Sequence, residues 1–198
     1  MTVSVVGHSS PDTDSVTSAI ALTALLTAQG QDAKACMQTN AENLNPESKL
    51  VLEKFGLTAP EQISDAAGKQ LALVDFSDIA QGPENISAAE VVMIVDHHKI
   101  GDVTTNNPIL FRAEPVGCTG TVLHKMFKEA GVAIPKNVAG GMLAAILSDT
   151  VNFKSPTCTE DDKAAVNELK NVAGVEDTEA LFMDMLKAKS AVAGVPAK

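Results

Sequence analysis

Short apolar runs separated by polar loops dominate the first half of the chain. Residues 71–75 and 91–96 have the length of strands and do not alternate with polar positions, so we expect both to be buried on two faces, as parallel strands are. Residues 2–7 are a β-branched run that ends in glycine, which also predicts a buried strand. Residues 32–37 and 109–113 are predicted as two further strands, the second of them at an edge of the sheet.

Helical patterns alternate with these strands and then take over the second half of the chain. One helix is predicted from a cap at Asp14 or Ser15 to a stop at Gly30, and another from Pro46 to near Gly56. Four more are predicted at residues 122–130, 137–147, 159–172 and 178–189. This order of elements predicts an α/β fold with a doubly wound, mostly parallel sheet and helices on both faces.

Composition narrows the class of protein. A chain of 198 residues with 45% hydrophobic residues is long enough for one well-packed domain. Aromatic residues make up only 3%, with no Trp or Tyr, which disfavours a nucleic-acid binder that stacks bases on aromatic rings. The net charge of -10 repels phosphate backbones, although bound cations can invert the local potential at a phosphate site.

The compartment is predicted from what the sequence lacks. The three cysteines are odd in number, widely spaced and form no Cys-x-x-Cys pair, so we expect reduced thiols in a cytoplasmic protein. The first residues have no basic region before their short apolar run, unlike a signal peptide. No segment approaches the roughly 20 apolar residues that a membrane span needs. We therefore expect neither a membrane nor a nucleic acid as a partner.

Acidic and imidazole side chains follow three of the predicted strands. In open α/β sheets, the loops at the carboxyl ends of the strands converge on one crevice, so these side chains are expected to meet in space. They are His8, Asp12 and Asp14 after the first strand, Asp75 after a second, and Asp96, His97 and His98 after a third.

Such a cluster of carboxylates cannot stay ionised at close range unless cations balance it. Carboxylates with imidazoles suit Mn²⁺, Co²⁺ or Zn²⁺, and the hard oxygen donors favour Mn²⁺ over thiophilic metals. None of the cysteines is expected in the cluster. The residues alone therefore predict a dinuclear metal site.

Each member of the cluster also has a simpler explanation. A single Asp after a strand is commonly a turn or helix-cap residue: Asp14 could cap its helix, and Asp12 could form an Asx-turn. His124 stands by itself on a predicted helix and is interpreted as a surface or packing residue. Adjacent histidines at the end of an apolar strand are harder to explain in this way. Asp149 follows an apolar helix and is by itself a weak signal.

The spacing of these residues resembles a known family. The pattern His8-x-x-Pro11-Asp12-x-Asp14 together with Asp96-His97-His98 is similar to the DHH phosphoesterase superfamily. Within it, the finer resemblance is to the manganese-dependent, family II inorganic pyrophosphatases. The features that carry this finer resemblance are Thr13 between the two acids, where the nuclease branch usually has glycine, the triplet at 148–150 and the Phe-Lys-Ser-Pro-Thr run at 153–157.

The resemblance implies a role for each residue of the cluster. The first metal would be held by His8, Asp12 and Asp75. The second would be held by Asp14, Asp75, His97 and Asp149, with Asp75 bridging the pair. His98 would be the catalytic residue that faces the substrate phosphate, and Asp96 would orient an imidazole through its ring N–H. The cofactors would be two divalent ions, first of all Mn²⁺, with Co²⁺ or Mg²⁺ as alternatives.

The resemblance also implies an activity and a domain plan. The activity would be hydrolysis of pyrophosphate to two phosphates by a water that attacks between the cations. Residues 1–189 would form the catalytic domain and residues 190–198 a linker to a C-terminal, substrate-gripping domain that this chain does not contain. We therefore expect weak hydrolysis, because four carboxylates leave a site loaded with two divalent cations roughly neutral. The family further implies a homodimer formed through this domain, for which the edge strand at 109–113 is available.

Two other functions remain open from the sequence. One is a phosphodiesterase or exopolyphosphatase of the same superfamily, which would use the same metals. A phosphodiesterase that acts on oligonucleotides would also need basic or aromatic residues to bind the bases, and we do not find them in the sequence. The other is a dimerisation module that binds metal and is catalytically silent.

Overall fold

The computed structural model of the chain describes residues 1–190. Within this range one six-stranded sheet has the strand order β3-β2-β1-β4-β5-β6, and every neighbouring pair is parallel. The strands are β1 (Val3–Val6), β2 (Ala33–Met37), β3 (Glu61–Gln62), β4 (Gln70–Val74), β5 (Glu90–Asp96) and β6 (Leu110–Ala113). The five predicted strands are confirmed, including β6 at an edge. The two-residue β3 was not predicted because it is too short to show a pattern.

All six predicted α-helices are also present in the described residues. They are α1 (Thr13–Ala28), α2 (Pro46–Phe55), α3 (Thr119–Ala130), α4 (Lys136–Asp149), α5 (Glu160–Ala173) and α6 (Thr178–Ser190). Three single-turn 3₁₀ helices were not predicted: η1 (Ala41–Asn43), η2 (Ile79–Gln81) and η3 (Ile86–Ala88). The predicted cap of the first helix was wrong: Asp12 is the N-cap and accepts a hydrogen bond from the Ser15 amide at 2.9 Å.

The winding of the chain reverses between β1 and β4, which are neighbours in the sheet. From β1 the chain passes through α1 to β2, and from β4 it passes through η2 and η3 to β5 on the other side. Because parallel crossovers are right-handed, these two connections lie on opposite faces of the sheet. The carboxyl ends of β1 and β4 therefore form the switch point where ligands of open α/β sheets bind.

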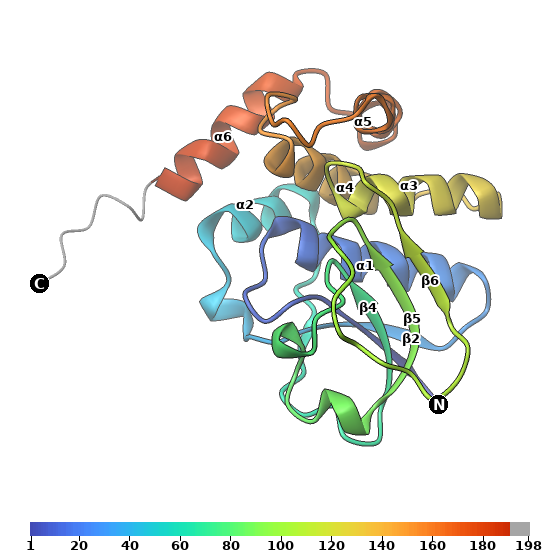
Figure 1. Ribbon diagram of the computed structural model, residues 1–198. Helices are drawn as coiled ribbons and strands as arrows, with labels where there is room; N and C mark the ends of the chain where they lie inside the picture. Colours follow the sequence, from blue (N-terminus) through green and yellow to red (C-terminus); the bar gives the residue numbers. More distant parts are fainter. Residues whose placement is uncertain (191–198) are drawn as a thin grey trace, which may run out of the picture.

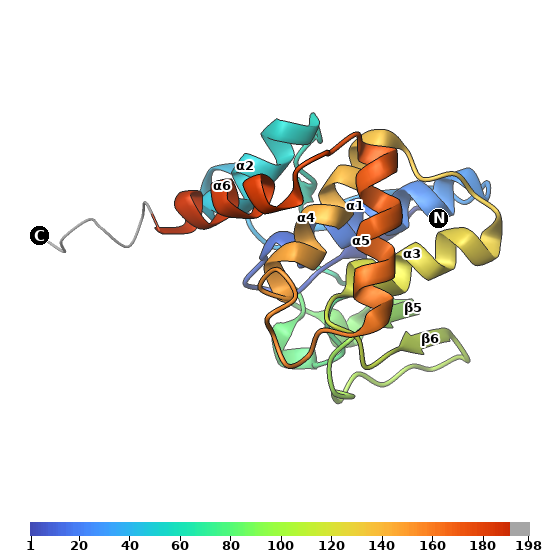
Figure 2. The same cartoon turned by 90° about the horizontal axis from the view of Figure 1, so that it is seen from above.

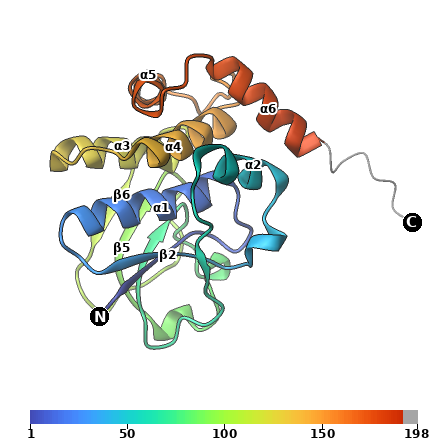
Figure 3. The ribbon, with the colours of Figure 1, turned by 180° about the vertical axis from the view of Figure 1, so that it is seen from behind.

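The α-helices pack on one face of the sheet (Figures 1 and 3). Val5, Ala72 and Val95 point to this face and share its core with α1, α3 and α4. The opposite face is buried by η2, η3 and loops, and within residues 1–190 no α-helix covers it. The α/β class and the parallel sheet are confirmed. Helices were predicted on both faces, but in residues 1–190 the second face carries only the 3₁₀ helices η2 and η3 and loops. The connection from β4 to β5 contains Gly82 and Pro83, which favour turns over a long helix.

Helix α4 is enclosed by other helices along most of its length. Figure 2 shows it in the middle of the helices, with α2 and α6 on one side and α3 and α5 on the other. A Cβ atom at Gly140 would lie 2.1 Å from a ring carbon of Phe55, and one at Gly141 would lie 2.8 Å from Leu57. The two glycines therefore let the α4 backbone lie close to these side chains.

Helix α6 includes Ser190, the first residue of the predicted linker, and the rest of that linker (191–198) lies outside the described residues. Among residues 1–190, no helix has both the length and the apolar character to cross a membrane.

Candidate metal centre

The predicted site residues meet at the carboxyl ends of β1, β4 and β5. His8 follows β1 after one glycine, Asp75 directly follows β4, and Asp96 is the last residue of β5. Asp12 and Asp14 stand at the start of α1, and Asp149 is the last residue of α4. One structural location therefore collects side chains that the sequence spreads over 142 positions, from 8 to 149.

The first group consists of His8, Asp12 and Asp75. His8 Nε2 lies 3.3 Å from Asp75 Oδ2 and 3.7 Å from Asp12 Oδ1. One nitrogen or oxygen atom from each of the three residues lies within 4.8 Å of the other two, close enough to share one metal ion. These are the three residues that the resemblance assigns to the first metal.

The second group is built around Asp14 and His97. His97 Nε2 lies 3.3 Å from Asp75 Oδ1 and 3.8 Å from Asp14 Oδ2. Asp149 contributes an atom within 4.8 Å of Asp14, and its Oδ2 is buried with no hydrogen-bond partner among residues 1–190. The four residues expected to hold the second metal are therefore neighbours.

Asp75 lies between the two groups. Its Oδ2 faces His8 and its Oδ1 faces His97, so one carboxylate presents one oxygen to each group. The residue is 1% exposed and its backbone has a φ of 67°, in the left-handed region that non-glycine residues rarely adopt. Such a conformation costs about 1–3 kcal/mol and persists where the surroundings enforce it, commonly at functional sites.

Residues 116–120, between β6 and the first turn of α3, form a frame on one side of the second group. The Thr119 amide donates to Asp14 Oδ2 at 2.7 Å, and the Gly120 amide donates to Asp14 Oδ1 at 3.2 Å. The Thr119 hydroxyl donates to Asp75 Oδ1 at 3.1 Å. The positive end of the α3 dipole thus faces two buried carboxylates.

The same segment orients His97. Its Nδ1 lies 3.0 Å from the carbonyl oxygen of Val116, which can only accept a hydrogen bond, so Nδ1 carries the proton. In the neutral imidazole this leaves the lone pair on Nε2, the atom that faces Asp75 and Asp14. His97 therefore presents the nitrogen that a metal would need.

Asp96 organises the two histidines that follow it. Its Oδ1 accepts hydrogen bonds from the backbone amides of His97 and His98 at 2.8 and 3.1 Å and from His98 Nδ1 at 2.9 Å. Asp96 thus holds one imidazole through its ring N–H, and that imidazole belongs to His98. The His98 side chain is 51% exposed and lines a cavity of about 400 Å³ next to His8. Other residues that line this cavity are Ser9, Ser77, Gln81 and Lys99.

The carboxylates of the site are poorly accommodated in the absence of cations. Burial, reinforced by the charge of Asp75, raises the pKa of Asp14 to about 7. Burial and then the charge of Asp14 raise the pKa of Asp149 well above its usual range. Acids that resist ionisation in this way gain most from a divalent cation.

The imidazoles compensate part of this charge. Burial lowers the pKa of His8, but the neighbouring carboxylates of Asp12 and Asp75 outweigh it and raise the pKa to about 10. Burial likewise lowers the pKa of His97, and the carboxylates of Asp75 and Asp14 raise it to about 10. Burial opposes ionisation of Asp75, yet its close contacts with His8 and His97 hold its pKa below the usual range. Oxygen and imidazole donors, with an unpartnered buried carboxylate oxygen, fit divalent cations such as Mn²⁺.

One expectation about this cluster was wrong. Cys118, the N-cap residue of α3, is fully buried, and its sulfur lies within 4.8 Å of carboxylate oxygens of Asp14 and Asp149. No local pattern in the sequence indicates this position, because Cys118 reaches the site through the packing of α3 against α1. Burial first, and then the charge of Asp14, raise the pKa of this thiol well above its usual range, so it is a protonated neighbour of the acids.

His124 was expected outside the site and is found outside it. It packs between α3 and α5, where its Nε2 lies 3.1 Å from Glu168 Oε2.

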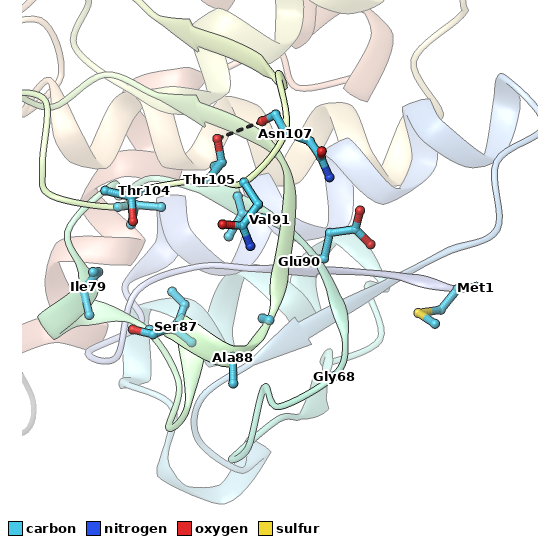
Figure 4. A pocket seen from close by; sticks show the side chains of 14 residues that line it. Met1, Gly68, Ile79, Ser87, Ala88, Glu90, Val91, Thr104, Thr105 and Asn107 are labelled. Carbon is cyan, nitrogen blue, oxygen red and sulfur yellow. Dashed lines mark hydrogen bonds between the residues drawn. The ribbon is translucent and has the colours of Figure 1, made fainter.

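A second cavity of about 400 Å³ lies at the other end of the sheet (Figure 4). Its lining includes Met1, Glu90 and Val91, at the amino ends of the strands, and a short turn in which the Thr105 hydroxyl donates to the Asn107 carbonyl at 2.9 Å. Among the described residues around it, Glu90 is the only acid and no histidine or cysteine is present. This cavity has no metal-binding chemistry.

Comparison with known proteins shows which family the chain belongs to. Residues 2–146 match the DHH family, N-terminal domain. The chain belongs to the DHH family. The matched range contains all the clustered residues from His8 to His98, and Asp149 lies just beyond it.

Individual relatives extend the similarity over nearly the whole chain. A manganese-dependent inorganic pyrophosphatase of Methanothrix thermoacetophila is 50% identical over 194 residues, which cover 98% of this chain and 61% of the relative. A crystal structure from Methanococcus jannaschii, described as a candidate family II inorganic pyrophosphatase, is 40% identical, with a TM-score of 0.89 over 98% of this chain and 63% of that one. An exopolyphosphatase-related protein from Bacteroides fragilis is 16% identical with a TM-score of 0.66 over 94% of this chain and 56% of its own, a likeness of fold alone. The chain thus spans about three fifths of the length of these proteins.

Proposed function

We propose that this DHH domain, residues 1–189, hydrolyses inorganic pyrophosphate to two phosphates at a dinuclear manganese centre. The observation that carries the proposal is Asp75, a buried carboxylate with one oxygen toward each of two groups of metal-binding atoms. The names of two relatives, which are 50% and 53% identical to this chain over 194 and 184 aligned residues, support the same metal and substrate.

The ligand sets follow from the two groups. His8, Asp12 and Asp75 would hold the first cation. The resemblance assigns the second to Asp14, Asp75, His97 and Asp149, which would hold it from the positions described above. When bound, two such cations neutralise charge on the phosphoryl oxygens and favour loss of a proton from the attacking water. The carboxylates of Asp14 and Asp149, which resist ionisation without cations, then become fully ionised ligands.

His98 is the residue that meets the substrate. Its Nδ1 is occupied by Asp96, so Nε2 remains for a phosphate oxygen in the adjoining cavity. The hydrogen bond to Asp96 raises the pKa of His98, which favours the protonated ring. A protonated imidazole at His98, beside the Asp75 carboxylate, donates a hydrogen bond to the leaving phosphate or transfers a proton to it. The proton transfer would be general acid catalysis.

The substrate is a small phosphoanhydride and not a nucleic acid. The net charge of -10 opposes a polyanionic backbone, and the chain has no Trp or Tyr on which bases could stack. The three unpaired cysteines fit a reducing compartment, and we place the protein in the cytoplasm.

A homodimer through the β6 edge of the sheet belongs to the same proposal. Among residues 1–190, β6 has one neighbouring strand, β5, so its outer backbone groups are available to a second copy. Leu110 and Phe111 on this strand are 47% and 44% exposed, and a matching strand would bury them. Sedimentation analysis should show a dimer, and a monomer at micromolar concentration would refute this part.

The test of the function compares three substrates with the Mn²⁺-loaded protein: pyrophosphate, a longer polyphosphate and a dinucleotide. We expect phosphate release from pyrophosphate to be the fastest. His98→Gln should retain both Mn²⁺ ions and lose about 10²–10⁴-fold in turnover, the usual contribution of a general acid. Preference for the dinucleotide would favour a phosphodiesterase, and metal binding without hydrolysis would favour the silent module.

A further inference from the structure

Residues 116–120 touch the second metal group at several points. A carbonyl of this segment faces His97 Nδ1, and the Thr119 amide and hydroxyl donate to Asp14 and Asp75. Three of the four residues that we assign to the second metal are therefore oriented by one short segment. Whatever fixes the segment also fixes the distances between those three side chains.

A buried acid on α5 holds this segment. Asp162 is 0% exposed, and its Oδ2 accepts a hydrogen bond from the Gly117 amide at 2.9 Å. Its Oδ1 accepts one from the Thr121 hydroxyl at 2.6 Å. Asp162 thus grips the segment at Gly117 and, one residue beyond its end, at Thr121.

Gly117 fits tightly between two helices. A Cβ atom there would lie 2.6 Å from Thr150 Cγ2, at the end of α4, and 2.9 Å from Asp162 Oδ2. Any larger residue would separate the segment from Asp162. The hydrogen bond between the Gly117 amide and Asp162 therefore depends on a glycine at position 117.

We propose that Asp162 is a positioning residue for the second metal, acting through residues 116–120. This inference rests on the proposed dinuclear centre and adds a residue far from it in the sequence. Groups that orient metal ligands change metal affinity by about 10–100-fold when they are removed. Asp162 acts one step further out, so we expect about 10-fold weaker binding of the second ion.

The first metal should be unaffected. His8 and Asp12 make no hydrogen bond to Asp162 or to residues 116–120 within the described part of the chain. The two metal positions share Asp75, but the Thr119 hydroxyl contacts its Oδ1, the oxygen that faces His97 in the second group, while its Oδ2 faces His8 in the first. A positioning role therefore predicts an unequal effect on the two ions.

A purely structural role predicts something else. Asp162 is also part of the capping box of α5, where its Oδ2 accepts from the amide and hydroxyl of Thr159 at 2.7 Å each. Loss of a cap lowers the stability of the whole domain without a preference for one metal. Asp177 offers a matched control, because it caps the start of α6 through the Ala180 amide at 2.9 Å and is exposed.

The experiment titrates Mn²⁺ into wild type, Asp162→Asn and Asp177→Asn and follows the electron paramagnetic resonance signal. Two ions that share a carboxylate give an exchange-coupled signal, whereas one bound ion gives an isolated signal. We expect Asp162→Asn to bind the first ion normally and to need about 10-fold more Mn²⁺ for the coupled signal. Thr121→Val, which leaves the carboxylate in place, should show a smaller shift of the same kind. Asp177→Asn should match wild type.

A second readout needs no metal. Amide hydrogen exchange of Thr119 and Gly120 in the metal-free protein should be faster in Asp162→Asn than in Asp177→Asn. Equal metal titrations for all variants, or equal weakening of both ions, would overturn the positioning role. If wild type binds no coupled pair, the proposed function fails, and with it the role toward the metal, while amide exchange still reports whether Asp162 holds the segment.

Discussion

Asp149→Asn should stabilise the metal-free protein while it destroys the second metal position. The Asp149 carboxylate is buried beside Asp14, and its Oδ2 has no hydrogen-bond partner among the described residues. An asparagine has nearly the same shape and no charge, and its amide can donate to the neighbouring acids. The residue would therefore be optimised for a cation and not for the stability of the fold.

The magnitude follows from the acids around it. The pKa of Asp14 rises from 3.8 to about 7 through burial and the charge of Asp75, and at about 1.4 kcal/mol per pKa unit this corresponds to roughly 4 kcal/mol of unfavourable free energy when Asp14 ionises. A neutral side chain at position 149 avoids a cost of this kind, which is about 1.4 kcal/mol for each pKa unit by which burial raises the pKa of an acid. We expect a gain of about 1–4 kcal/mol for Asp149→Asn, or a Tm higher by roughly 2–16 °C at about 2–4 °C per kcal/mol for a domain of this size.

The stability difference between Asp149→Asn and wild type should depend on pH. The pKa of Asp149 is raised in the folded protein, by burial and then by Asp14, so the wild type loses stability as the pH rises above the ordinary aspartate pKa. The advantage of Asp149→Asn should therefore be absent near pH 3 and grow toward neutral pH. Thermal unfolding in the presence of a chelator, from pH 3 to 8, measures it.

Added Mn²⁺ should reverse the order of stability at a thousandfold excess over Kd, because wild type then gains about 4.1 kcal/mol of binding free energy that the variant has lost. Glu53→Gln, at an exposed position on α2, serves as a control and should change little in either condition. A variant that is less stable than wild type at neutral pH without metal would refute the reasoning. So would a stability gain that does not depend on pH.

Three other results are expected. Asp75→Ala should abolish tight binding of both Mn²⁺ ions, because its two oxygens serve both groups; a calorimetric titration that still shows one tight ion would contradict the bridge. Binding of Mn²⁺ near pH 7 should release protons, because the pKa values of His8 and His97 are raised to about 10 and a histidine must be neutral to bind a metal. The affinity for Mn²⁺ should therefore rise with pH. The metal-free chain should lose the stability contributed by the two imidazolium groups between pH 6.5 and 10. Calorimetry in buffers of different ionisation enthalpy would detect this release, and its absence would count against both histidines as ligands. Gly140→Ala should lower the free energy of unfolding by about 1–3 kcal/mol in urea titrations, because its Cβ would overlap the Phe55 ring, and an unchanged midpoint would mean that α4 can shift without cost.

The sequence was informative where one strong rule applied. Strands of a parallel sheet end at the same edge, so acids and histidines after three apolar strands had to converge, and His8, Asp75 and His97 do. Apolar runs of strand length and glycine stops also gave the elements to within a few residues. Asp149 needed more than spacing, because its position depends on how α4 packs against α1 and α2.

The parts that the sequence did not show depend on contacts between distant segments. The Thr119 amide donates to Asp14, which lies 105 positions away in the sequence. No local sequence pattern predicts that a backbone amide will be the partner of a distant carboxylate. Cys118 was missed for the same reason. Asp162 stands in the first turn of α5, and a capping box has the same composition whether or not its acid also holds another loop.

The most direct test of the central claim is a count of the metal ions and a measurement of their coupling. The metal-free protein would be titrated with Mn²⁺ by calorimetry, and the paramagnetic resonance spectrum would be recorded at each step. We predict two ions per chain and a coupled spectrum once the second has bound, because Asp75 faces both positions. One ion per chain, or two ions with isolated spectra, would contradict a dinuclear centre bridged by Asp75.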